Sequence, residues 1–362
     1  MPEEFPADGA VRIPKIIHQT WKNTYIPSHY VEWIRSWNKH NPDWQYMFWT
    51  DESARNFIAE KYPQILPAYD GYLENIRRAD AMRYAILYEY GGVYADLDME
   101  SLLPLDRIMR KYSCVLPQEP YEHPIIDSNV DHLVINALMA CRAKHPLMKV
   151  FLDNIPKYMH MWNVLDSTGP HYITLLYNEY TKETNLKPTD DDGVYLAPAE
   201  YFFPTIDPEK FSYMKTRCYN FENMSFLQKR GCVALKSRGM KRKPYTFSFT
   251  VHHWVHTYLK TKMFESYYDI FELVPTAIIR TSEGYARMVY QWSSTCIYNY
   301  EWMAYCCFFM YNSDKSIYIQ VKYTYLHVQV YVTIRTSFWY SDHTSIKINV
   351  CGTCLVIVHT RL

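Results

Sequence analysis

The clearest hydrophobic pattern in the chain lies between residues 75 and 100. Apolar side chains recur at three- and four-residue intervals over residues 75–90, with no Pro or Gly between them, which predicts a helix. We expect this helix to stop at Gly91 and Gly92, because a left-handed residue after a helix costs glycine nothing. The apolar run at 93–95 is short enough to predict a buried strand.

The carboxyl end of that predicted strand carries two carboxylates, Asp96 and Asp98. The carboxyl ends of strands are where α/β sheets bind ligands, and two carboxylates one residue apart can share a divalent cation. An isolated Asp-x-Asp is weak evidence, since a solvated turn explains it equally well. On the preceding helix, Asp80 and Arg83 stand one turn apart and share a face.

Apolar segments on either side of this stretch extend the same pattern. Residues 13–17 and 44–49 predict strands, residues 31–39 predict a helix, and Asp51 is expected to cap another helix that runs through residue 61. Strands that alternate with helices in this order favour an α/β fold with a mixed, mostly parallel central sheet.

Two further helices are predicted beyond the carboxylates, over residues 135–143 and 147–158. Four cysteines in this part of the chain are widely spaced, and we interpret them as buried thiols. They are Cys114, Cys141, Cys218 and Cys232.

Charge and composition narrow the function classes. Lys plus Arg and Asp plus Glu both number 38 among 362 residues, so the formal charge is zero and no nucleic-acid footprint is indicated. Aromatic residues make up 17%, and aromatic clefts commonly stack on sugars and bases. Residues 1–12 are short and acidic and show no signal anchor, so we treat them as an N-terminal extension.

The composition changes after about residue 262. No Pro follows Pro275, yet the segment is rich in Tyr, Thr and Val and holds five of the nine Cys. Alternating positions favour strands, but turn signals to fold them back are scarce. We therefore expect one domain over residues 13–262 and an atypical tail over 263–362, either disordered or not a genuine domain.

The motifs in the first part of the chain, in their order, resemble the Asp-x-Asp glycosyltransferases of family 32. The matching stretches are Ile-Pro-Lys-Ile-Ile-His-Gln-Thr-Trp at 13–21, Asn-Pro-Asp-Trp at 41–44, Phe-Trp-Thr-Asp at 48–51 and Arg-Ala-Asp through Asp-Leu-Asp at 78–98. Within that family the chain is most similar to mannosyltransferases that build mannosyl inositol phosphorylceramide. More distantly it resembles the glucosyltransferase domains of large bacterial toxins. The resemblance implies a GT-A type nucleotide-sugar-binding fold.

The resemblance also implies a metal site. Asp96 and Asp98 would hold Mn²⁺ or Mg²⁺, and a His near the end of the catalytic region would complete the coordination. His253, directly before Trp254, matches that position better than His252, which we keep in reserve. A surface His pair is the alternative.

Donor contacts follow from the same resemblance. Asp80 and Arg83 would hold the sugar hydroxyls and Tyr94 would contact the donor, although Arg83 can also serve as an ion-pair partner of Asp80. Trp21 would stack on the base of the nucleotide sugar, with a core Trp as the rival interpretation. Asn136 and the Thr168-Gly169-Pro170 turn match two further family landmarks, the first in the segment on the acceptor side.

The implied function is retaining, metal-dependent transfer of a sugar, most simply mannose from GDP-mannose to an inositol phosphorylceramide-type sphingolipid. A front-face displacement fits, because no nucleophile stands beside the carboxylates in the sequence. Two alternatives stay open: transfer of glucose, galactose or N-acetylglucosamine from a UDP-sugar to a glycan or protein, and a non-catalytic protein that binds glycans or sugar nucleotides. Relatives work in the Golgi or other endomembranes, with membrane association; the missing anchor leaves the cytoplasm as the alternative.

Overall fold

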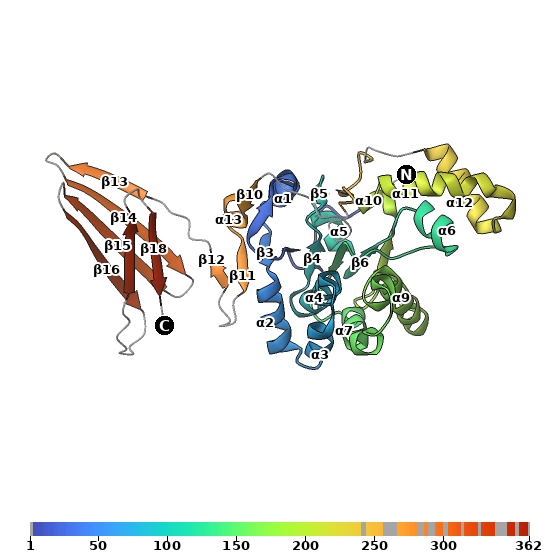
Figure 1. Cartoon of the computed structure of the whole chain (residues 1–362), viewed down its shortest axis with the longest axis horizontal. Helices are drawn as coiled ribbons and strands as arrows, with labels where there is room; N and C mark the ends of the chain where they lie inside the picture. The colour runs from blue at the N-terminus through green and yellow to red at the C-terminus, as the bar shows by residue number, and fades with distance from the viewer. Residues whose placement is uncertain are drawn as a thin grey trace. The chain divides into compact units, whose positions relative to one another are not determined.

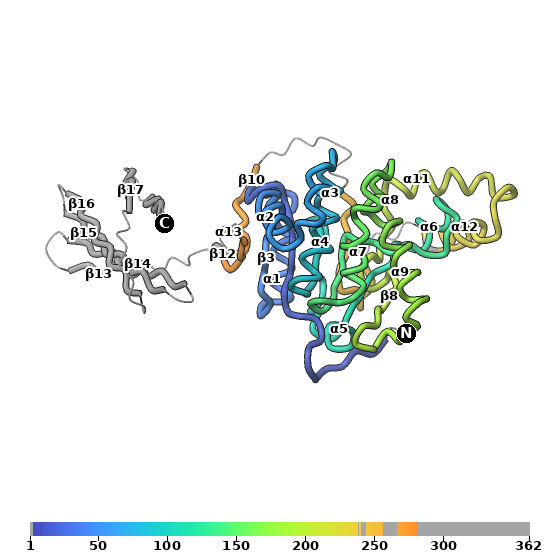
Figure 2. The backbone as a smooth tube through the Cα atoms, turned by 90° about the horizontal axis from the view of Figure 1, so that it is seen from below, coloured from blue at the N-terminus to red at the C-terminus, as the bar shows by residue number. Residues whose placement is uncertain are grey.

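The computed structural model describes residues 3–239, 244–255 and 266–280, and beyond them the backbone of strands between residues 286 and 360. The chain divides into two compact units, Met1–Val289 and Tyr290–Leu362. Figures 1 and 2 show the helices and the central sheet of the first unit from two directions.

An eight-stranded sheet forms the centre of the first unit, in the order β12-β11-β3-β1-β4-β7-β6-β8. Parallel pairing joins β11 to β3, β3 to β1, β1 to β4 and β6 to β8, and antiparallel pairing joins the rest. The predicted α/β class with a mixed, mostly parallel sheet is therefore confirmed. The strands are β1 (Ile16–Thr20), β3 (Gln45–Trp49), β4 (Gly92–Ala95), β6 (Cys114–Pro117), β7 (Leu138–Cys141), β8 (Tyr195–Ala197), β11 (Ile278–Arg280) and β12 (Ala286–Met288).

Helices cover both faces of this sheet (Figure 1). One face carries α1 (Val31–His40), α5 (Asp106–Lys111), α10 (Ala199–Phe202) and α13 (Ile270–Leu273). The other face carries α2 (Asp51–Lys61), α3 (Leu66–Gly71), α4 (Asn75–Tyr90), α7 (Pro146–Tyr158) and α9 (Pro170–Thr184).

Side chains of the central strands alternate between two hydrophobic cores. In β4, Val93 and Ala95 join the core beneath α1, whereas Tyr94 joins the core beneath α4. Strands buried on both faces have no polar side, which explains why their sequences are continuous apolar runs.

A helical lobe with its own small core lies at one end of the first unit (Figure 1). Its helices are α6 (Glu122–Ser128), α11 (Pro208–Arg217), η2 (Cys218–Asn223) and α12 (Phe226–Arg238). A disulfide between Cys218 and Cys232 ties η2 to α12, and a second one joins Cys114 to Cys141 across β6 and β7. The interpretation of these four cysteines as free buried thiols is therefore wrong.

Three other local predictions are corrected. Residues 138–141 form β7 rather than part of a helix, because they pair with β4 and β6 inside the sheet. Thr50, not Asp51, caps α2, since the Thr50 side chain accepts the Ser53 N–H at 3.1 Å. The strand predicted at 13–17 begins later, at Ile16.

The first unit continues beyond the predicted boundary at residue 262. Strand β10 (Tyr267–Asp269) pairs with β2 (Tyr25–Pro27), and β11 joins the central sheet beside β3. Residues 266–280 and strand β12 thus belong to the α/β unit, because their backbone completes these pairings. In the second unit, an antiparallel sheet is formed by β13 (Ser294–Asn299), β14 (Met303–Asn312), β15 (Lys315–Thr324) and β16 (His327–Thr336), and β17 (Ile346–Cys351) pairs with β18 (Leu355–Thr360). The side chains of the tail beyond residue 280 lie outside the described residues.

No helix among the described residues combines the length and the apolar character needed to cross a bilayer.

Candidate active site

The turn between α4 and β4 sets the path of the strand that leads to Asp96 and Asp98. Gly91 has φ +66° and Gly92 has φ +97°, a region that favours glycine. A Cβ atom on Gly91 would lie 2.4 Å from the backbone nitrogen of Ala143, and one on Gly92 would lie 2.5 Å from the carbonyl oxygen of Ile16. Only glycine fits at either position, so the predicted end of the helix is confirmed.

Trp21 and Asp96 come to the same edge of the sheet. Strands β1 and β4 are parallel neighbours, Trp21 directly follows β1, and Asp96 directly follows β4. Gln19 links the two strands, because its side-chain nitrogen donates to the carbonyl oxygen of Asp96 at 3.2 Å. The carboxyl edge of the sheet therefore gathers the residues that the sequence singled out.

The carboxylate of Asp96 is fixed by Tyr94 of β4 and Arg83 of α4. Tyr94 donates its hydroxyl hydrogen to Oδ1 of Asp96 at 2.6 Å, and a guanidinium nitrogen of Arg83 lies 3.3 Å from the same oxygen. The Arg83 guanidinium also lies over the Tyr94 ring, 4.5 Å from its centre. Burial raises the pKa of Asp96, and Arg83 offsets part of that rise. The Asp96 side chain keeps 29% of its surface exposed.

Asp80 is more deeply buried than Asp96, and both of its carboxylate oxygens accept hydrogen bonds. Asn136 donates to one oxygen at 2.9 Å, Thr168 donates to the other at 2.8 Å, and Arg83 lies 3.2 Å from the first. Burial raises the pKa of Asp80 to about 6, with Arg83 opposing the rise. Arg83 thus bridges Asp80 and Asp96, and its pKa is raised by these carboxylates despite burial.

The Asp98 side chain is enclosed by the segment that follows β9 (Thr250–His252). Nε2 of His252 lies 3.1 Å from Oδ1 of Asp98, and the Val255 N–H donates to Oδ2 at 2.8 Å. The His253 N–H donates to the carbonyl oxygen of Asp98 at 2.9 Å. Burial alone would raise the pKa of Asp98, but His252 outweighs it, so that pKa is lowered.

An unusual backbone angle at Trp254 makes this enclosure. Trp254 has φ +54°, a left-handed conformation that is uncommon for a bulky side chain. The turn brings the Val255 N–H back toward Asp98, while the Trp254 ring packs 4.3 Å from the His252 ring. Strained residues of this kind cluster at functional sites, and no sequence pattern signalled this one.

His252, and not the preferred His253, lies beside Asp98. Nε2 of His253 lies 2.8 Å from the Glu100 carboxylate, and its ring stacks on Trp33 at 4.0 Å. Successive residues at the end of a strand point to opposite sides, so His252 turns toward Asp98 and His253 turns away. The reserve candidate is the one that the structure places at the aspartates.

Tyr94 is also placed differently from the prediction. Its side chain is fully buried, with its ring beneath Arg83 and its hydroxyl on Asp96, so it orients a carboxylate instead of facing a ligand. Trp21 remains partly exposed and packs edge-on against Tyr30. Among the described residues, the buried Trp21 indole nitrogen has no hydrogen-bond partner.

Asn136 and Thr168 complete the site. From the sequence, both residues were known only as family landmarks. In the structure, the side chains of both donate hydrogen bonds to the Asp80 carboxylate. Neither contact has a local spacing signal, because the residues lie far from Asp80 in the sequence.

The side chains at this edge are of the types that bind a divalent cation, but among the described residues the ligand atoms of Asp96, Asp98 and His252 do not form a group that lies within 4.8 Å of one another. Oδ2 of Asp96 has no protein partner among the described contacts, and Nδ1 of His252 is buried without one. Two carboxylates and an imidazole are ligands that suit Mn²⁺, and carboxylates also suit Mg²⁺.

Comparison with known proteins decides the family. Residues 27–115 match the family described as the glycosyltransferase sugar-binding region containing the DXD motif. A glycosyltransferase named L373 from Acanthamoeba polyphaga mimivirus is 30% identical over 221 residues, which cover 57% of this chain and 80% of that protein. The chain belongs to this DXD glycosyltransferase family.

Two fungal members of the family resemble the chain more strongly over a shorter part. Inositol phosphoceramide mannosyltransferase 3 of Schizosaccharomyces pombe is 36% identical over 49% of this chain and 49% of its own length. Mannosyl phosphorylinositol ceramide synthase SUR1 of Saccharomyces cerevisiae is 35% identical over 47% of this chain and 43% of its own length. The chain thus spans about half the length of these fungal relatives.

Proposed function

We propose that this protein is a metal-dependent, retaining mannosyltransferase that uses GDP-mannose and acts on an inositol phosphorylceramide-type sphingolipid. The observation that carries the proposal is the contact of His252 with Asp98, on the motif whose first carboxylate, Asp96, follows β4 at the carboxyl edge of the sheet. Family membership and the names of the fungal relatives supply the sugar and the lipid.

Each residue of the site has a role in this proposal. Asp96, Asp98 and His252 would hold Mn²⁺ or Mg²⁺, which supplies positive charge to the departing diphosphate. Arg83 and Tyr94 fix the carboxylate of Asp96, so that one of its oxygens stays free. The Val255 N–H fixes Asp98 in the same way.

The donor lies along the same edge of the sheet. Trp21 offers a partly exposed indole ring on which the base can stack. Asp80 and Arg83 support the sugar subsite from the layer beneath, since each is only 2% exposed. Direct contact of these two side chains with sugar hydroxyls stays a proposal.

The transfer follows from this arrangement. The acceptor hydroxyl oxygen bonds to the anomeric carbon on the face that the diphosphate leaves, and the hydroxyl proton passes to the departing diphosphate. The configuration of the sugar is retained. Asp80 is unsuited to a nucleophilic role, because Asn136, Thr168 and Arg83 occupy its oxygens.

The two disulfides bear on location. Disulfides persist in oxidising compartments, so the pairs Cys114–Cys141 and Cys218–Cys232 favour the lumen of the Golgi or another endomembrane over the cytoplasm.

The direct test is transfer of labelled mannose from GDP-mannose to inositol phosphorylceramide in detergent with Mn²⁺. We expect a labelled mannosylated lipid that is lost on chelation with EDTA. UDP-glucose, UDP-galactose and UDP-N-acetylglucosamine are the comparison donors. Faster transfer from one of these to a glycan or protein would replace mannosyl transfer as the function, and binding of GDP-mannose without any turnover would favour a non-catalytic binding protein.

A further inference from the structure

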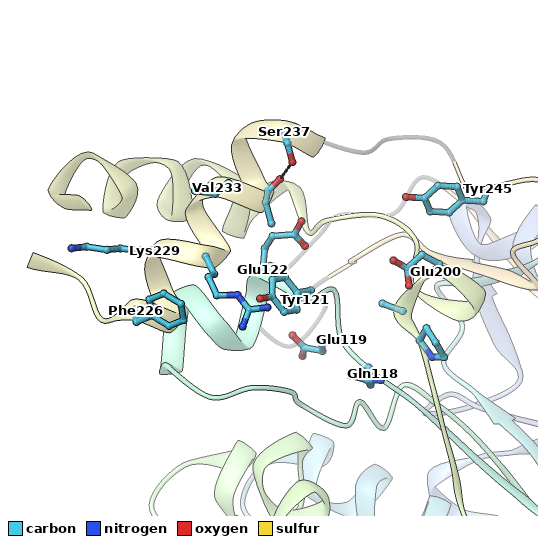
Figure 3. Close-up of a pocket in the computed structure, with 14 residues that line it drawn as sticks. Gln118, Glu119, Tyr121, Glu122, Glu200, Phe226, Lys229, Val233, Ser237 and Tyr245 are labelled. Carbon is cyan, nitrogen blue, oxygen red and sulfur yellow. Dashed lines mark hydrogen bonds between the residues drawn. The ribbon is translucent and has the colours of Figure 1, made fainter. Parts of the chain in front are cut away.

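A groove of about 1080 Å³ lies along the helical lobe (Figure 3). One wall is the face of α12, and the other walls are the segment after β6 and the start of α10. The groove is lined on the α12 side by Phe226, Lys229, Arg230, Val233 and Ser237, and opposite them by Gln118, Glu119, Tyr121, Glu122, Glu200 and Tyr245.

The packing of α12 explains why these side chains face the groove. Gly231 lies so close to α6 that a Cβ atom there would be 2.6 Å from a methyl carbon of Ile125. Residues at the positions next to that contact point outward, and Phe226 is left 79% exposed and Val233 60% exposed. Both line the groove, so apolar surface faces it without cover from the described residues.

The α12 side of the groove supplies its cations. Residues 208–239 contain seven Lys or Arg and two Asp or Glu, a net charge of +5, whereas the opposite wall carries the carboxylates of Glu119, Glu122 and Glu200. Lys229 and Arg230 are part of the groove, and neither has a carboxylate within ion-pair distance among the described residues. Two unpaired cations beside exposed apolar side chains fit a ligand with an anionic group next to an apolar tail.

The opposite wall offers hydrogen-bonding side chains and leads to the aspartates. Glu119 lines the groove and lies 3.0 Å from Nδ1 of His123, whose ring packs against Trp254 at 5.2 Å. Trp254 packs in turn against His252, the partner of Asp98. Packed side chains therefore connect the wall of the groove to the proposed metal site.

We propose that this groove binds the acceptor, and that its ligand is a polyol headgroup joined through a phosphodiester to lipid chains. Lys229 and Arg230 pair with the phosphodiester, Phe226 and Val233 cover the first part of the chains, and the carboxylates and Gln118 accept hydrogen bonds from the polyol. The proposal rests on the transfer reaction proposed above. In that reaction the polyol supplies the attacking hydroxyl.

The test compares matched charge variants of the whole protein. Lys229→Gln and Arg230→Gln remove groove cations, whereas Lys236→Gln removes an exposed cation of the same helix that does not line the groove. Binding is measured by co-sedimentation with phosphatidylcholine vesicles that contain or lack phosphatidylinositol, and by titration with soluble inositol phosphate and with inorganic phosphate. Unfolding temperatures and Mn²⁺-dependent hydrolysis of GDP-mannose are recorded for every variant.

We expect each groove variant to weaken binding to phosphatidylinositol vesicles about fivefold, and the double variant roughly twentyfold, with Lys236→Gln close to the wild type. Phe226→Ser should weaken vesicle binding but not inositol phosphate binding, whereas Tyr219→Ser, equally exposed outside the groove, should do neither. Hydrolysis of GDP-mannose should be unchanged.

Three results would overturn the groove assignment. The first is an equal loss of vesicle binding in Lys236→Gln, which would mean diffuse attraction to the lobe. The second is binding of inorganic phosphate as tight as that of inositol phosphate, which would mean an adventitious ion only. The third is a wild type that shows no preference for vesicles with phosphatidylinositol. Hydrolysis distinguishes this failure from failure of the proposed function. A protein that binds the lipid through these residues but never hydrolyses a nucleotide sugar would keep the groove and lose the transferase.

Discussion

Nε2 of His252 lies 3.1 Å from Oδ1 of Asp98, and the neighbouring His253 turns the other way to meet Glu100. This pair of contacts assigns different tasks to two adjacent histidines. We predict that His252→Ala raises the Mn²⁺ concentration needed for half-maximal activity by at least about tenfold, in line with the loss of a ligand or of the group that orients one. His253→Ala should change it less than about threefold, because the His253 side chain pairs with Glu100 and stacks on Trp33 instead of meeting Asp98.

Metal titration of donor hydrolysis makes this comparison, with isothermal titration of Mn²⁺ as the second readout. If His253→Ala raises the required Mn²⁺ concentration more than His252→Ala does, His253 is the metal ligand, as the sequence suggested, and the assignment of His252 is contradicted.

Trp21 is expected to carry donor affinity. We predict that Trp21→Ala weakens GDP-mannose binding by roughly 1 to 3 kcal/mol, the range measured for aromatic stacking on a base. Trp44→Ala is the matched control, because Trp44 is buried in the core and lies away from the proposed donor site. The control should lose about 3 kcal/mol or more of unfolding free energy with unchanged donor affinity. A Trp21→Ala protein that loses unfolding free energy but keeps its affinity for GDP-mannose would show that Trp21 is a core residue.

Glu119 makes the stability of the chain depend on pH. Burial raises the pKa of this carboxyl, but Lys210 and His123 outweigh burial and lower it to about 2. A carboxyl whose folded pKa is below its unfolded value stabilises the fold above the unfolded pKa, and that stability is lost as the pH falls through the folded pKa. The unfolding free energy of the wild type should therefore be larger than that of Glu119→Gln by roughly 2 to 3 kcal/mol at pH 7. This difference should disappear as the pH falls from about 5 to about 2.

Urea unfolding at a series of pH values measures that gap. Glu200→Gln, in the same groove, is the control and should show a smaller difference from wild type at pH 7. A gap for Glu119→Gln that stays constant down to pH 2 would show that its charge does not contribute.

The residues that the sequence identified were those governed by local rules. Gly91 and Gly92 predicted the end of α4, and the alternation of predicted strands with predicted helices indicated a mixed, mostly parallel sheet. The errors came where distant pairing decides. The apolar run at 138–141 has no local feature that distinguishes a strand from a helix, and its pairing with β4 and β6 makes it a strand.

The site shows the same division. Asp96 and Asp98 could be named from one short motif, but Asn136 and Thr168 reach Asp80 only through the fold. The choice between His252 and His253 depends on the direction of side chains at the end of β9, which two adjacent letters do not encode. The left-handed backbone of Trp254 also leaves no trace in the sequence.

The extent of the α/β unit leads to a further prediction. Ile270, Val274 and Ala277 are buried in the main core, and β11 pairs with β3. A chain ending at residue 265 loses these contacts and should lose at least about 5 kcal/mol of unfolding free energy. A chain ending at residue 289 should match the full chain in unfolding temperature and in donor hydrolysis. Equal stability for the two shortened chains would return the boundary to residue 262.

The central claim is that Asp96 and Asp98 hold a divalent cation for transfer from a nucleotide sugar. Its most direct test is the rate of Mn²⁺-dependent hydrolysis of GDP-mannose by wild type, Asp96→Asn, Asp98→Asn and the control Glu100→Gln, with unfolding temperature confirming the fold of each. We predict a loss of at least about a hundredfold for each aspartate variant, since a lost ligand raises the barrier by several kcal/mol, and less than about threefold for Glu100→Gln. An Asp98→Asn protein that keeps more than about a tenth of the wild-type rate would contradict the account.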